Sequence, residues 1–376
     1  MTMISGYKLK DCGFLQADIL LTSLHKGMRS SQVPSFQTYV DNQGLDTHVV
    51  VGLCQKILVV NDQFAVAFAG DVPAIQAVIR LIEKLIDQAP ALTGKRFADA
   101  VLADSKLNQS KIEIIALSVE DDEVHISNIY AEFGHGNEHF EMWVGGSGAE
   151  HTIKHYKAYP PNEFDVSEED IVVRGTCMAL DQFAHHLIDE FDKKFQSETI
   201  KNSFGGGYEV LAFYDGKFRK ISDVVYAFAD AEFDVDGILQ VDFPKCLIKS
   251  AYEGDDLKIR SVEFQYNEDE DEHVALNDRT FTIAPIARYQ ETTVVDNLNG
   301  LKFMGRFLCF LIKVKTNNGD FIVPAIRSYE SDLHFLHEAF IASVNQDFVS
   351  ISYSDIFRED IKAHVLGLME QPNATI

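Results

Sequence analysis

The run Phe64–Ala69 is apolar at every position, and it constrains the fold more than any other segment of this chain. Neighbouring side chains of a strand point to opposite faces, so a strand of this composition must be covered on both sides. The sequence therefore predicts a strand inside a layered core. Gly70 and Asp71 end this run, and apolar residues then recur at helical spacing over residues 72–88, which predicts an amphipathic helix.

Strand patterns flank this core on both sides. Residues 3–10 and 14–18 are predicted to form two strands, and Asp215-Gly216 predicts a tight hairpin turn between residues 208 and 221. Further strands are expected at 111–119, 123–130 and 140–144, and further helices at 148–157 and 175–195. This order suits two antiparallel sheets that pack together and carry helices on their outer faces.

The pattern changes near residue 222. Beyond it the chain shows many short β-type runs and one helical stretch at about 329–344. We therefore expect two domains, residues 1–222 and residues 223–376, and the second is predicted to be a smaller, β-rich accessory domain.

The charge balance limits the possible partners. With 33 basic and 58 acidic residues the formal net charge is −25, and such a surface repels nucleic acid and anionic lipid. No apolar run approaches the length of a membrane span, and no secretory signal pattern is expected. The five cysteines form no CxxC pair, which favours reduced thiols in a cytoplasmic protein. The acidic run at 268–272 lacks the glycine and the spacing of a calcium loop, so we interpret it as solvated surface.

Thr2 is a candidate nucleophile. It follows Met1 directly, and removal of Met1 would leave a hydroxyl and a free α-amine on the same residue. Such a pair can act as nucleophile and base together, because an α-amine titrates near pH 8 and is partly unprotonated at neutral pH.

Short motifs follow Thr2 in a fixed order along the first 222 residues. They are Gly6–Asp11, Gln16–Asp18, Gln55–Ile57, Ala67–Asp71, Gly146–Gly148, Gly205–Val210 and Asp215–Phe218. In this order they resemble the motifs of a proteasome β-type subunit, a member of the N-terminal nucleophile (Ntn) hydrolase superfamily, and those of the related bacterial protease ring. The resemblance covers roughly 60% of the chain.

The resemblance implies a role for each of five residues. Thr2 Oγ would attack the scissile carbonyl. Lys56 would lower the pKa of the Thr2 amine, and Asp18 would hold Lys56. The Gly70 backbone N–H would donate to the oxyanion, and Ser147 would complete the polar network around the amine. Other interpretations stay open, because Asp18 and Lys56 suit a surface ion pair, Gly70 a strand end and Ser147 a helix N-cap.

Some positions depart from the family pattern. Asn202 stands at the expected position of an Asp and Gly205 at that of a Ser, both before the last hairpin. Ala149 stands where a second small hydroxyl is expected, and a long polar loop at 22–47 could cover the cleft. These departures bear on whether catalysis survives.

Together these features predict an α+β protein, a four-layer αββα sandwich followed by the β-rich domain. The implied function is a threonine-type amide or peptide hydrolase that needs no metal or cofactor. By analogy it would form a homo-oligomeric ring and could work with an unknown activator. The alternatives are a catalytically inactive scaffold or recognition subunit and an Ntn acylase for small amides.

Overall fold

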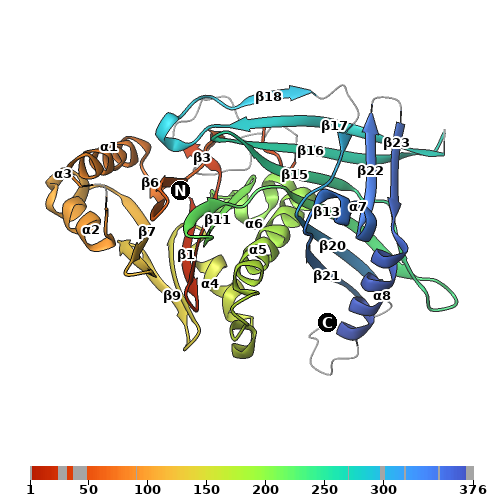
Figure 1. The fold of residues 1–376 in the computed structure, drawn as a ribbon. Coiled ribbons are helices and arrows are strands. Elements are labelled where there is room, and N and C mark those ends of the chain that lie inside the picture. The colour runs from red at the N-terminus through yellow and green to blue at the C-terminus, as the bar shows by residue number, and fades with distance from the viewer. Residues whose placement is uncertain are drawn as a thin grey trace. The chain divides into compact units, whose positions relative to one another are not determined.

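A computed structural model describes residues 2–23, 32–36, 49–89, 91–269, 271–296, 301–316, 319–345 and 348–369 (Figure 1). The chain separates into two compact units. Unit 1 comprises Met1–Ile221 and Ile283–Thr292, and unit 2 comprises Ser222–Thr282 and Thr293–Ile376. The chain thus leaves unit 1 after Ile221 and returns to it for one short segment. Of the predicted loop at 22–47, only residues 22–23 and 32–36 lie within the described part of the chain.

The predicted fold class, a four-layer αββα sandwich, is wrong. Among the described residues, strands make up 47% and helices 29%, and the strands form several mostly antiparallel sheets, so the fold is β-rich. The prediction assigned two of the four layers to helices, because helical periodicity is a strong local signal. Pairing between distant strands leaves no comparable local signal, and the sequence therefore understated the sheets.

One sheet of unit 1 has six strands. In sheet order they are β12 (Lys217–Lys220), β11 (Tyr208–Tyr214), β2 (Cys12–Asp18), β1 (Met3–Leu9), β10 (Phe140–Gly146) and β9 (Glu132–Gly136). The predictions of the first two strands and of the hairpin at 208–221 are confirmed. Met3 pairs with Gly146, and Asp18 pairs with Tyr208. The start of β1 and the ends of β2 and β10 therefore meet at one edge of this sheet.

The second sheet of unit 1 has four strands. They are β5 (Ile57–Asn61), β6 (Phe64–Gly70), β7 (Ile112–Glu120) and β8 (Glu123–Ile129). The alanines of β6 pack with Ile4 and Leu15 of the six-stranded sheet. Its phenylalanines pack against the helices α1 (Val72–Gln88) and α2 (Gly94–Ala103). This confirms that the run Phe64–Ala69 is covered on both faces, and α1 matches the predicted helix at 72–88.

The remaining elements of unit 1 are the long helix α5 and several short strands and helices. They are β3 (Leu20–Ser23), β4 (Val49–Leu53), α3 (Ser105–Asn108), α4 (Ala149–Lys157), η2 (Pro161–Phe164), α5 (Ile171–Lys193), η3 (Lys194–Gln196), α6 (Glu198–Lys201) and η4 (Ile286–Arg288). Two of these match predicted helices, because α4 lies within 148–157 and α5 overlaps most of 175–195.

Unit 2 is built on a sheet of eight strands. In order along the sheet they are β18 (Thr293–Asp296), β17 (Glu272–Ile283), β16 (Asp256–Asn267), β15 (Cys246–Glu253), β13 (Val224–Phe233), β20 (Phe307–Thr316) and β21 (Gly319–Ser328), with β14 (Leu239–Val241) beside β13. A smaller sheet contains β19 (Leu301–Lys302), β22 (Phe340–Asn345) and β23 (Phe348–Tyr353), and the helices are α7 (Asp332–Glu338) and α8 (Asp355–Met369). The predicted helix at 329–344 is wrong beyond Glu338, because β22 pairs with β23 there.

The packing of α2 gives a stability prediction. Phe97 is 1% exposed, and its ring meets that of Phe64 edge-on at a centroid distance of 5.5 Å. We expect Phe97→Ala to lower the free energy of unfolding by about 3–5 kcal/mol, because it leaves a cavity in this core. Leu102→Ala on the same helix, where the side chain is 43% exposed, should change it by no more than about 0.5 kcal/mol. Urea denaturation measures both, and equal losses would contradict the core position of Phe97.

Candidate functional site

A buried ion pair lies where β2 ends and β1 begins. Lys56 Nζ lies 2.6 Å from Asp18 Oδ1, and the two side chains are 3% and 0% exposed. The same ammonium donates to the Leu20 carbonyl at 2.8 Å. Asp18 also accepts from the backbone N–H groups of Met3 and Leu20, at 2.8 and 3.0 Å. The pair is therefore fixed by several partners, and the interpretation as a surface ion pair is wrong.

Thr2 immediately precedes β1 and lies beside the turn that follows β10. Its carbonyl accepts from the backbone N–H of Gly148 at 3.2 Å and from Ser147 Oγ at 3.3 Å. Gly146 has φ +80°, and a Cβ there would lie 2.0 Å from the Thr2 carbonyl oxygen. The turn can approach Thr2 this closely only because residue 146 is a glycine.

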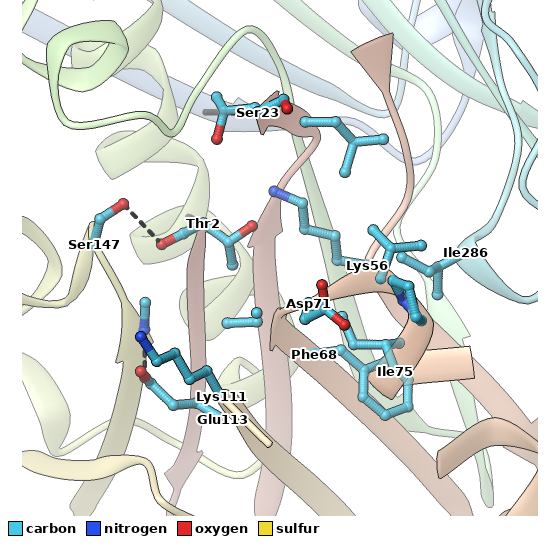
Figure 2. A pocket seen from close by; sticks show the side chains of 17 residues that line it. Thr2, Ser23, Lys56, Phe68, Asp71, Ile75, Lys111, Glu113, Ser147 and Ile286 are labelled. Atoms are coloured by element: carbon cyan, nitrogen blue, oxygen red, sulfur yellow. Dashed lines mark hydrogen bonds between the residues drawn. The ribbon is translucent and has the colours of Figure 1, made fainter. Parts of the chain in front are cut away.

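A cleft of about 700 Å³ opens beside Thr2 (Figure 2). Its lining includes Lys56, Gly70 and Ser147, together with charged side chains and an apolar part. Figure 2 shows the Lys56 ammonium pointing toward Thr2. Gly70 has φ +121°, and a Cβ there would lie 2.2 Å from the Lys111 carbonyl oxygen. At this position, too, the backbone requires a glycine.

The structure therefore brings four of the five proposed site residues to one cleft, with Asp18 directly behind Lys56. Ser147 contacts the carbonyl of Thr2, whereas the sequence suggested a place around its amine. The alternative of Ser147 as a helix N-cap is wrong, because Gly148 is the N-cap of α4 and α4 has no side-chain cap.

Two of the departures from the family pattern, Gly205 and Asn202, have distinct surroundings. The Gly205 N–H donates to Asp18 Oδ2 at 2.9 Å. A Cβ at Gly205, which has φ +115°, would lie 2.2 Å from Glu190 Oε1, so no serine fits there without a shift. Asn202 Nδ2 lies 3.2 Å from His151 Nε2 at an exposed position and is not among the residues that line the cleft.

Glu190, to which sequence reasoning assigned no role, lies beneath this glycine turn. It is fully buried, and its carboxylate accepts from Thr199 Oγ1, the Tyr208 hydroxyl and the Gly206 N–H at 2.8–2.9 Å. Burial raises the pKa of Glu190 to about 7. Consecutive glycine N–H groups thus hold two carboxylates, those of Asp18 and Glu190.

Glu209 was also missed, although it lies within one of the quoted motifs. Its Oε1 accepts from the backbone N–H groups of Lys56 and Ile57 at 2.5 and 2.9 Å, and its Oε2 lies 2.7 Å from Lys220 Nζ. Glu209 therefore positions the backbone that carries Lys56. A carboxylate in the otherwise apolar strand β11 was the available signal.

No protein-family model matches this chain, and no curated protein matches its sequence. Among the residues described above, no helix is long and apolar enough to cross a membrane.

The raised pKa of Glu190 gives a pH prediction. Folding shifts this pKa upward from 4.5 to about 7, so the folded protein keeps a proton that the unfolded chain releases in this window. The contribution of Glu190 to the free energy of unfolding therefore falls as the pH rises from 4.5 to 7. We expect the stability of wild type relative to Glu190→Gln to fall by up to about 3 kcal/mol over this range.

Urea denaturation at several pH values measures this difference, and the other titrating groups cancel between the two proteins. Leu102→Ala is the control, because it removes no titratable group and its side chain is 43% exposed. Its stability relative to wild type should stay constant with pH. A constant difference for Glu190→Gln as well would contradict the prediction.

Proposed function

We propose that this protein hydrolyses an amide bond with Thr2 as an N-terminal nucleophile, as in the Ntn hydrolases that its motifs resemble. The observation that carries the proposal is the shared cleft of Thr2 and Lys56. A buried ammonium held by Asp18 favours negative charge beside it, which suits a developing alkoxide or oxyanion.

The reaction requires cleavage of the peptide bond before Thr2, so that its α-amine is free. Thr2 Oγ would then attack the amide carbon while the amine takes the hydroxyl proton. The C–N bond breaks, and the leaving nitrogen receives that proton. Water next hydrolyses the ester on Thr2 and regenerates the hydroxyl. The Gly70 N–H would donate to the oxyanion, and one such donor typically contributes about 3 kcal/mol.

The proposed substrate is a peptide or a smaller amide. A cleft of about 700 Å³ falls within the usual range for small-molecule and cofactor sites, roughly 300–1,000 Å³. By analogy with proteasome-type enzymes we also propose that the protein is a cytoplasmic homo-oligomer and that an unknown activator stimulates its activity. Sedimentation velocity tests this assembly, and a monomer at all concentrations would oppose it.

A catalytically inactive scaffold is the second candidate. It is favoured by Gly205, which offers no hydroxyl, and by Asn202, which contacts His151 and does not line the cleft. A scaffold would need no reactive nucleophile, so the two candidates differ in the reactivity of Thr2.

We expect a β-lactone to label Thr2. Attack by the hydroxyl opens the lactone ring and forms an ester, so the protein gains the mass of the whole reagent. Intact mass spectrometry and peptide mapping locate this adduct, and the same spectrum shows whether the chain starts at Thr2. Thr2→Ala should abolish the adduct, whereas Thr2→Ser keeps a hydroxyl and should retain it.

Thr293→Ala is the matched control, because Thr293 is exposed and lies outside the cleft. Its adduct should equal that of wild type. No adduct on a wild-type chain that starts at Thr2, or an equal adduct on Thr2→Ala, would defeat the enzyme and favour the scaffold. Parallel assays with a peptide library and with N-acyl amides separate a peptidase from a small-amide acylase.

A further inference from the structure

We propose that Ile286 determines the size of the apolar substrate group that the cleft accepts beside the scissile bond. The proposal rests on the proposed function of Thr2. It concerns the segment Ile283–Thr292, which returns to unit 1 from the C-terminal part of the chain.

This segment is anchored to the residue that precedes Lys56. Gln55 donates its backbone N–H to the Ala284 carbonyl at 3.1 Å, and its carbonyl accepts from the Ile286 N–H at 3.0 Å. Gln55 Nε2 also donates to the Ile283 carbonyl at 2.6 Å. Further along, Thr292 Oγ1 donates to the Leu53 carbonyl at 3.3 Å. These bonds fix the position of Ile286 relative to Lys56.

Ile286 belongs to the apolar part of the cleft. It is 1% exposed, packs in the core that contains α1, and lines the cleft with Phe68 and Ile75. Figure 2 shows these three side chains around the backbone end of Lys56, whose ammonium extends toward Thr2. An apolar substrate group placed there would stop at the Ile286 side chain.

The other part of the cleft is polar. Lys111, Glu113 and Ser147 line it, and Glu113 Oε2 accepts from the Gly146 N–H at 2.6 Å. A substrate with one apolar side chain would therefore place it against Phe68, Ile75 and Ile286, away from Lys111 and Glu113. Shortening Ile286 removes methyl and methylene groups from this wall and should admit a longer side chain. One methylene in such a pocket typically changes selectivity about 10-fold to 200-fold.

The test uses peptidyl amides of a fluorescent amine that carry Ala, Val, Leu or Phe before the scissile bond. We expect Ile286→Ala to raise the ratio of kcat/KM for Phe to that for Ala by at least about tenfold. Ile286→Val should raise the same ratio by a smaller factor. It replaces Ile286→Ala in the test if that variant fails to fold. Using a ratio cancels any general loss of activity.

Ile82→Ala is the matched control. Ile82 is 2% exposed in the same core but does not line the cleft, so its loss should leave the ratio unchanged. An unchanged ratio in both Ile286 variants, with the β-lactone adduct on Thr2 intact, would overturn this proposal and leave the proposed function standing. A wild-type chain that starts at Thr2 and forms no adduct would overturn both.

Discussion

The ion pair between Lys56 and Asp18 is the interaction on which the candidate site depends. Two charges at this depth are costly to desolvate, so the pair persists only if its remaining hydrogen-bonding capacity is used. Asp18 accepts from Lys56 and from the backbone N–H groups of Met3, Leu20 and Gly205. The carboxylate thus joins segments that are far apart in sequence. Its hydrogen bond from the Met3 N–H fixes the start of β1, directly after Thr2.

Glycines and buried carboxylates organise the surroundings of this pair. Gly146 lets the turn after β10 reach the Thr2 carbonyl, and Gly205 leaves room for the carboxylate of Glu190. Glu209 holds the backbone at Lys56. Glu190 lies where a serine at position 205 would need space, so this chain has a different polar network beneath the turn from the one that its motifs imply.

The errors of the sequence predictions share one physical origin. The stretch at 329–344 shows helical spacing, yet Phe340–Asn345 forms a strand because β23 offers it a partner. The αββα class followed from the order of strands and helices along the chain, and it is wrong because the described residues form several mostly antiparallel sheets and are mainly β. Strand pairing is a non-local interaction, and it can override a local preference.

The sequence by itself determined the elements whose signals are local. The strand at Phe64–Ala69, the helix at 72–88 and the hairpin turn at Asp215-Gly216 follow from periodicity and turn chemistry, which act over a few residues. The motif order also singled out Thr2, Asp18, Lys56, Gly70 and Ser147. Only the tertiary structure decided that Glu190 and Glu209 support the site and that Ile286 lines it. Those contacts join residues far apart in sequence, and they depend on how distant strands, turns and helices pack together, which no local pattern encodes.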